Sequence, residues 1–170
     1  YRDDLPDLAV GDTVTFAMEL ADRYPGEKGP HRVRSHARRI QFMSKDDYLV
    51  QIKKQKRRLL NQIRTIYREE RGVHDLVRHL DPSDDVFVQT CQLQAVRQGL
   101  IRERLEAIRN RINVLVDDLA ANKVAEEAES AAMAKLGTDL QIIADKYVGR
   151  AASLLREQAT VTDGGADDRN

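Results

Sequence analysis

The chain changes its pattern of apolar and polar residues at Ser44. Before Ser44, every second residue from Val14 to Leu20 is apolar, which is typical of a strand with one buried face. A second strand is expected at about residues 33–43, after a loop at 24–30 that contains two prolines and two glycines. The pattern therefore predicts a β-hairpin near the N-terminus.

A hairpin of two strands is only marginally stable by itself, because its apolar face needs cover. We therefore interpret residues 1–43 as the C-terminal part of an Ig-like sandwich, whose other strands belong to an upstream domain. The apolar face is expected either to pack on the helices that follow or to lie exposed. The chain also lacks an initiator Met, so we expect it to be a segment of a longer polypeptide.

From Ser44 onward the apolar residues recur at alternating spacings of three and four, which predicts a long amphipathic helix. Ser44 and Asp47 have the spacing of a capping box, which marks the start of this helix. Lys56 and Glu70 occupy equivalent positions in the apolar stripe, where polar residues often specify register or partner. The stripe consists of Leu49, Ile52, Lys56, Leu59, Ile63, Ile66, Glu70, Val73, Val77 and Leu80.

Residues 81–85 (DPSDD) are expected to end the first helix and to cap a second. The second helix repeats the pattern, more weakly at Phe87, Cys91, Gln94 and Gln98 and strongly from Ile101 to Leu119. A reversal is expected at 120–124, followed by a third helix. The predicted stripe of the third helix is Met133, Leu136, Leu140, Ile143, Tyr147 and Leu154.

These patterns predict a mainly α fold, in which the hairpin precedes an antiparallel coiled-coil hairpin or three-helix bundle. The helices are placed at about 44–80, 84–121 and 125–158 within a helical region 44–158, and residues 159–170 are predicted to be a disordered tail. Dimerisation is the alternative way to cover the same stripes. The expected helix-interface residues are Leu49, Ile52, Leu59, Ile63, Ile66, Leu105, Ile108, Ile112 and Leu115.

The composition agrees with long helices, because 33% of the residues are charged and only 5% are aromatic. The formal net charge is zero, so no overall field attracts polyanions. The single cysteine, Cys91, excludes an internal disulfide bond. No apolar run approaches the ~20 residues that a membrane span requires, so a soluble segment without its own targeting signal is expected.

The sequence shows no arrangement of residues that is typical of an enzyme or a metal site. His74 and His79 are five residues apart, which places them about 140° apart on a helix and prevents joint metal binding. His31 and His36 belong to the predicted hairpin. Glycine-rich phosphate loops and nucleophile elbows are also missing from the sequence. We therefore expect no catalytic residues, no cofactor and no metal.

Charge is distributed unevenly along the chain. Residues 28–68 contain 13 Lys or Arg residues and only two acidic residues. One interpretation is that this basic stretch pairs with the acids Asp117, Asp118, Glu126, Glu127 and Glu129 inside the bundle. The alternative is a surface that binds nucleic acid or anionic lipid. The candidate anion-binding residues are Lys53, Lys54, Lys56, Arg57 and Arg58.

Two stretches, RRIQFMSKDDYL at 38–49 and IRNRINVLVDDLAANKV at 108–124, carry a resemblance to a known group of proteins. Residues 10–158 resemble a segment of large uncharacterised envelope proteins of planctomycete-type bacteria, in which β-sandwich repeats precede a helical region. The resemblance implies an extracytoplasmic location, a membrane anchor outside this segment and a role as a scaffold. It supplies no catalytic residues.

The function predicted from these observations is a non-catalytic structural or interaction module of a larger extracytoplasmic protein. It would serve as a scaffold, spacer or oligomerisation segment. A protein partner or self-association through the helices is expected, and a membrane contact only through regions outside this segment. Binding of a polyanion by the basic first helix is the alternative function.

Overall fold

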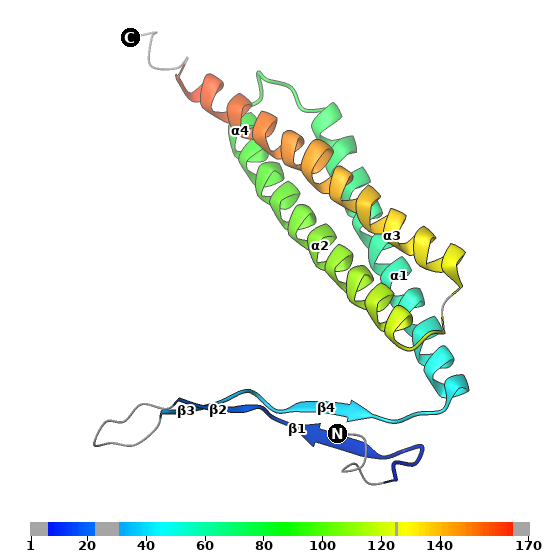
Figure 1. The fold of residues 1–170 in the computed structure, drawn as a ribbon. Helices are drawn as coiled ribbons and strands as arrows, with labels where there is room; N and C mark the ends of the chain where they lie inside the picture. Colours follow the sequence, from blue (N-terminus) through cyan, green and yellow to red (C-terminus); the bar gives the residue numbers. More distant parts are fainter. Residues whose placement is uncertain (1–6, 23–30, 125, 165–170) are drawn as a thin grey trace. The chain divides into compact units, whose positions relative to one another are not determined.

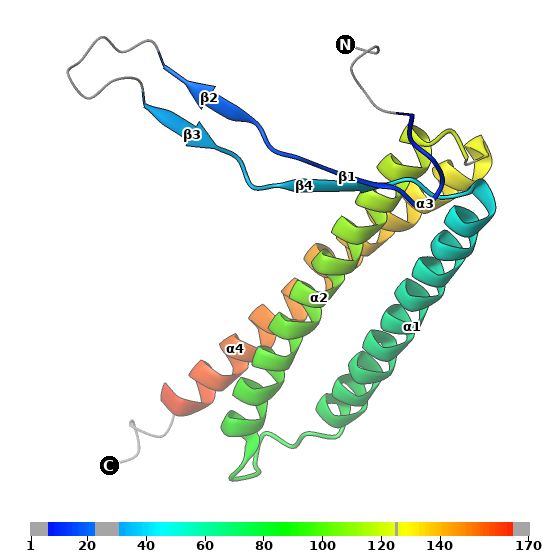
Figure 2. The same cartoon turned by 90° about the horizontal axis from the view of Figure 1, so that it is seen from below.

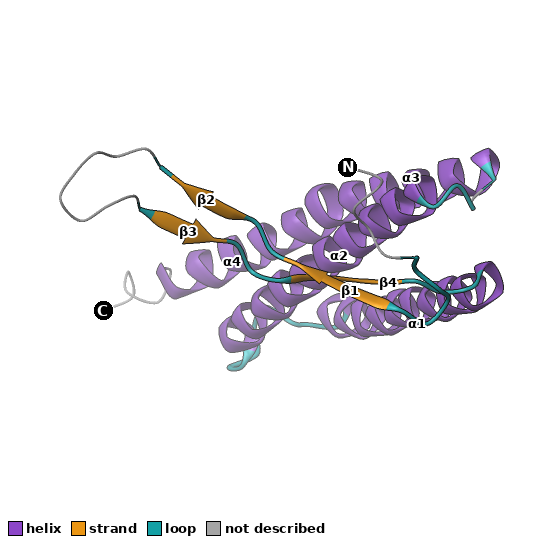
Figure 3. Ribbon diagram, turned by 60° about the horizontal axis from the view of Figure 1, so that its bottom comes forward, coloured by secondary structure: helices purple, strands orange, loops and turns teal. Residues whose placement is uncertain are grey.

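A computed structural model describes residues 7–22, 31–124 and 126–164. The described part is mainly helical, with a small β-hairpin followed by three long helical segments (Figure 1, Figure 3). The chain divides into two compact units, Tyr1–Lys53 and Lys54–Asn170, and the boundary falls inside the first helix. The prediction of a mainly α fold with an N-terminal hairpin is therefore confirmed.

Each arm of the hairpin consists of two short strands rather than one long strand. Strand β1 (Thr13–Phe16) pairs antiparallel with β4 (Arg38–Gln41), and β2 (Glu19–Ala21) pairs with β3 (Arg32–Arg34). Between the two ladders, the Met18 N–H donates to the side-chain oxygen of Ser35 at 2.9 Å. A side-chain acceptor thus replaces a backbone carbonyl, which interrupts the regular ladder predicted from the alternation.

The apolar face of the hairpin is mostly exposed. The register places Val14 opposite Ile40 and Leu20 opposite Val33, so these apolar side chains form cross-strand pairs. Val14 is half-buried, but Leu20 is 74% exposed. The predicted loop at 24–30 lies outside the described residues.

Helix α1 (Lys45–Arg78) begins at the predicted capping box. The Asp47 N–H donates to Ser44 Oγ at 3.1 Å, and the Ser44 hydroxyl donates to Asp47 Oδ2 at 2.6 Å. The helix buries one row of residues that recur every seventh position: Ile52, Leu59, Ile66 and Val73. Lys56, Ile63, Glu70 and Val77 lie beside this row and are half-buried.

Helix α2 (Phe87–Ala121) follows the turn that contains Pro82. The prediction that the acidic residues of 81–85 cap this helix is wrong, because Val86 is its N-cap and no side chain in the described part of the chain bonds there. Instead, Asp81 Oδ1 accepts hydrogen bonds from the Ser83 backbone N–H and hydroxyl, which hold the pKa of Asp81 below its ordinary value. The buried residues are Phe87, Cys91, Gln94, Ala95, Gln98, Ile101, Leu105, Ile108, Ile112, Leu115 and Leu119.

The predicted reversal after α2 is present. Lys123 adopts a positive φ of 51°, an uncommon conformation for a residue that is not glycine. The third helical segment then consists of α3 (Glu127–Ile142), a π-helical turn η1 (Ile143–Val148) and α4 (Gly149–Gly164). Helix α4 thus continues past residue 158, where the third helix was expected to end. Residues 165–170 of the predicted tail lie outside the described residues.

The predicted stripe of the third helix is correct only in its first half. Leu140 is buried, but Ile143, Tyr147 and Leu154 are each more than 40% exposed. A π-helical hydrogen bond spans one residue more than an α-helical one. The buried face after η1 is therefore shifted by one position along the chain from the predicted stripe. The segment after Leu140 buries Ala144, Val148, Ala152, Leu155 and Ala159 instead.

Small residues allow the third segment to approach α2 closely. A Cβ atom at Gly137 would lie 3.3 Å from Asn113 Oδ1 and 3.8 Å from Ile112 Cγ2, so α3 and α2 touch at this glycine. Farther along, Cys91 and Ala95 of α2 share a buried cluster with Leu155 and Ala159 of α4. Both views show α2 alongside this third segment (Figure 1, Figure 2).

Candidate interaction surfaces

The expected helix-interface residues are largely inaccessible to solvent. Seven of the nine are buried, and Leu49 and Ile63 are half-buried. The buried members belong to the α1 and α2 stripes that the sequence predicts; Ile52 lies in the N-terminal unit, and the other six lie in the C-terminal unit. The buried members are Ile52, Leu59, Ile66, Leu105, Ile108, Ile112 and Leu115.

Long polar side chains join α2 to α1. Arg111 Nη1 donates to Gln62 Oε1 at 3.1 Å, and Arg104 forms an ion pair with Glu69. Arg104 and Arg111 are seven residues apart on α2, and Gln62 and Glu69 are seven apart on α1, as expected for antiparallel neighbours. The α1–α2 contact therefore contains long side chains, whereas the α2–α4 contact contains small ones.

Two hollows lie between α1 and α2. The larger has a volume of about 600 Å³ and is lined by buried Leu59 and Leu115 together with exposed Arg58 and Val114. The second, of about 300 Å³, is lined by Val73, Ile101, Gly72 and Leu100. In both hollows, buried core residues lie next to exposed apolar residues of α2.

Helix α2 carries a second series of apolar residues at every seventh position, and this series faces solvent. We call it the outer row; it consists of Leu93, Leu100, Ala107 and Val114. The three large members are 51–59% exposed. Val96 stands beside the row and is also exposed. Each member of the row directly precedes a buried residue in the sequence, so the row borders the core side of α2.

A polar layer interrupts the core between α1 and α2. Gln98 is 2% exposed, and its Nε2 donates to Glu70 Oε2 at 2.8 Å. Gln98 Oε1 is buried and has no hydrogen-bond partner among the described residues, and such a group destabilises the fold. The hydrogen bond between Gln98 and Glu70 joins the α1 stripe to α2, and buried polar pairs of this kind can specify helix register.

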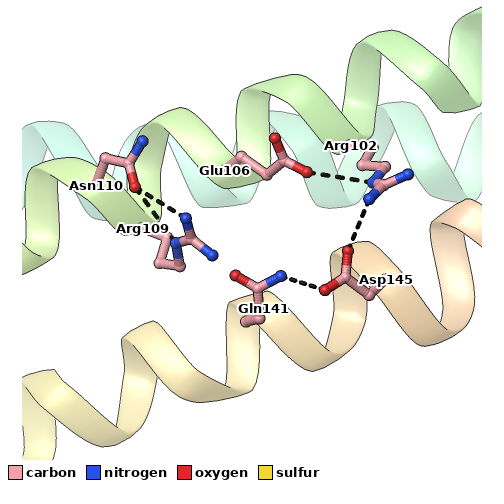
Figure 4. A network of polar contacts seen from close by, with 6 residues as sticks. All are labelled: Arg102, Glu106, Arg109, Asn110, Gln141 and Asp145. Carbon is pink, nitrogen blue, oxygen red and sulfur yellow. Dashed lines mark hydrogen bonds and ion pairs between the residues drawn. The ribbon is translucent and has the colours of Figure 1, made fainter.

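A second polar network joins α2 to the third segment. Arg102 forms ion pairs with Glu106 at 3.2 Å and with Asp145 at 2.9 Å, and Asp145 also accepts a hydrogen bond from Gln141 (Figure 4). Asp145 belongs to the π-helical turn η1. All these ion-pair groups are substantially exposed, so we expect each pair to contribute at most about 1 kcal/mol.

The candidate anion-binding residues of α1 do not share one environment. Lys56 is half-buried and forms an ion pair with Glu129, which agrees with the interpretation that the basic stretch pairs within the protein. Among the described residues, this is the ion pair that joins residues 53–58 to the acidic residues 117–129. Lys53, Lys54, Arg57 and Arg58 are exposed.

No group of three or more His, Cys, Asp or Glu residues in the described ranges is arranged to hold a metal ion. His31 bonds through Nδ1 to Asp22 at 2.9 Å in the hairpin, whereas His79 Nδ1 bonds to the Asp75 carbonyl oxygen of α1 at 2.7 Å. His36 and His74 are exposed. No described helix has the length and apolar character needed to cross a bilayer.

Cys91 is 2% exposed in the cluster with Ala95, Leu155 and Ala159. Burial raises the pKa of its thiol, so at a given pH it is less ionised than a free cysteine. We predict that the native protein reacts with a thiol reagent only through unfolding. The measurement is the rate of labelling as urea is increased, with Gln92→Cys in a Cys91→Ala background as the exposed control. Rapid labelling of native Cys91 would contradict the placement of this thiol in the core.

Comparison with known proteins found no family model, no curated protein and no solved structure that matches this chain. The resemblance to planctomycete-type envelope proteins therefore receives no support from these comparisons.

Proposed function

We propose that the helical unit is an antiparallel three-helix bundle that acts as a non-catalytic scaffold and associates with a second copy through the outer row of α2. The bundle is supported by buried rows on all three helical segments. The association is supported by one observation above all: α2 has two apolar rows, and only one of them is used by the core.

The outer row has the spacing of a helix–helix interface. Its members recur every seven residues over three intervals, which is the repeat that keeps one helix face against a partner. Single exposed apolar residues are common on protein surfaces, but a regular series on one helix is typical of an interaction site. Covering the exposed half of a leucine side chain is worth about 1 kcal/mol, so we expect the association to be weak and reversible.

We predict that the mass of the protein in solution rises with concentration and that Leu100→Lys removes this rise. Lysine at position 100 places a charge in the middle of the row, where burial against a partner is costly. Light scattering or sedimentation equilibrium over a wide concentration range measures the mass. Circular dichroism should show unchanged helix content, since Leu100 is 54% exposed.

Three further results decide the prediction. Ala107→Leu supplies the one small member of the row with a large side chain, and it should shift association to lower concentration. A wild-type protein that stays monomeric at all concentrations would refute association through this row. Arg150→Glu changes an exposed residue of α4. If it weakened association as much as Leu100→Lys does, the outer row would be refuted as the site, although association itself would stand.

The extracytoplasmic location and the membrane anchor outside this segment are proposed from the sequence resemblance alone. The association of helices does not depend on either. Detection of the full-length protein in a membrane or periplasmic fraction would test the location separately.

A further inference from the structure

A cationic ridge runs along the outer face of α1, opposite its buried row. We define the ridge as Lys54, Arg57, Arg64, Arg68 and Arg71, all exposed. Arg57, Arg64 and Arg71 recur every seven residues. Lys54 and Arg68 are fourteen residues apart and belong to the neighbouring row. At ~1.5 Å per residue the ridge is roughly 26 Å long.

Most cations of the ridge have no acidic partner among the described residues. Within the described part of the chain, Lys54, Arg57, Arg64 and Arg68 form no ion pair. Arg71 approaches Asp75 at 3.9 Å, a helical neighbour four residues away. By contrast, Lys56, Arg102 and Arg104 are paired across helices. The chain is neutral overall, so the uncompensated charge of the ridge is a local feature.

The shape and composition of the ridge favour a rigid, repeating array of phosphates as its ligand. Four of its five members are arginines, whose planar guanidinium groups bind phosphate oxygens in pairs of hydrogen bonds. An α-helix with its side chains is about 10–12 Å wide, and the major groove of duplex DNA is about 12 Å wide. A convex, straight ridge of cations therefore matches a duplex better than a compact anion.

Two other polyanions fit less well. A helix that binds a membrane surface inserts an apolar face, but the apolar face of α1 is buried in the protein. Single-stranded nucleic acid is held by several aromatic stacking platforms, and Tyr67 is the one aromatic residue between Lys54 and Arg71.

We propose that the cationic ridge binds the phosphate backbone of double-stranded nucleic acid without reading its sequence. The structure revises the residues that the sequence assigns to anion binding. Lys56 is removed because Glu129 neutralises it, and Arg58 lines the hollow between α1 and α2. Arg64, Arg68 and Arg71 are added. This proposal does not depend on association through the outer row.

The test is fluorescence anisotropy of a labelled 20-base-pair duplex of arbitrary sequence, titrated with the full 170-residue chain at several salt concentrations. If all five cations contact phosphates, log K should fall with log salt with a slope of about −4.5. The affinity should then decrease about 500-fold between 50 and 200 mM salt. A second duplex of unrelated sequence should bind equally well.

The ridge variant is Arg57→Gln/Arg64→Gln/Arg68→Gln, which keeps good helix formers and removes three charges. Its salt slope should fall to about −1.8, so that the same change in salt weakens binding only about tenfold. The matched control is Lys135→Gln/Arg150→Gln/Arg156→Gln, which changes the net charge equally on exposed positions of α3 and α4. Circular dichroism verifies that both variants fold.

Three results would overturn the proposal. These are an absence of binding at 50 mM salt, an equal loss of affinity in the ridge and control variants, and binding to phosphatidylserine vesicles without binding to the duplex. The first two reject the ridge as a site for nucleic acid, and the third assigns it to anionic lipid. None of them affects the mass measurements that test association through α2.

Discussion

Replacing Ile112 with alanine is expected to lower the free energy of unfolding by about 2–5 kcal/mol. Ile112 is 0% exposed, lines a hollow with Leu59 and Met133, and lies close to Gly137 of α3. Its side chain thus lies between α2 and both neighbouring helices. Alanine would remove three carbon atoms from this position and leave a cavity that the surrounding helices can only partly fill.

Urea denaturation followed by circular dichroism measures this loss. The control is Val114→Ala, two residues away on the same helix, where the side chain is 59% exposed. The control should change the free energy of unfolding by no more than about 0.5 kcal/mol. Similar effects of the two substitutions would show that Ile112 is not in the core.

A second large loss is expected from Ala95→Leu, which enlarges a residue at the contact between α2 and α4. Ala95 is 1% exposed and shares a cluster with Cys91, Leu155 and Ala159. Three additional carbon atoms cannot fit there unless the helices move apart or side chains leave their preferred rotamers. We expect the protein to lose about 1–3 kcal/mol of stability.

Thermal or urea unfolding of Ala95→Leu and Ala134→Leu provides the comparison. Ala134 is exposed on α3, and the change in helix propensity is the same, so its variant should unfold as the wild type does. If Ala95→Leu left stability unchanged, α2 and α4 would have to be farther apart than their small residues indicate.

The sequence predicts the α1 stripe and the C-terminal half of the α2 stripe well, because large aliphatic residues recur there in one unbroken heptad pattern. Ile52, Leu59, Leu105 and Ile112 are buried as expected. The predicted capping by the Ser44 hydroxyl is present, since its geometry depends only on residues three positions apart, whereas the Asp47 carboxylate accepts from that hydroxyl rather than from a backbone N–H.

The third segment could not be predicted from the same rule. A π-helical turn changes the number of residues per turn, and nothing in the local composition of residues 143–148 specifies it. The residues that pack after this turn include Ala144, Ala152 and Ala159. A search for large apolar residues passes over alanines, although small side chains are what a close helix contact requires.

The interaction surfaces were predicted only in part. The basic character of α1 is evident from composition. The sequence alone could not show that Lys56, unlike its basic neighbours, is neutralised, because this depends on the position of Glu129 on α3. The outer row repeats every seven residues in the sequence, one position before Ile101, Ile108 and Leu115. Periodicity cannot decide which of two adjacent rows is buried, because that depends on where the other helices lie.

We propose that two adjacent apolar rows of α2 have different roles, one in folding and one in association. The most direct test compares Leu105→Lys with Leu100→Lys, because the two leucines are five residues apart but are 3% and 54% exposed. Melting and mass are measured on both proteins. We predict that Leu105→Lys destabilises the fold severely, whereas Leu100→Lys melts as the wild type does and stays monomeric. Comparable melting of the two variants, or undiminished self-association of Leu100→Lys, would contradict this division of roles between the two rows.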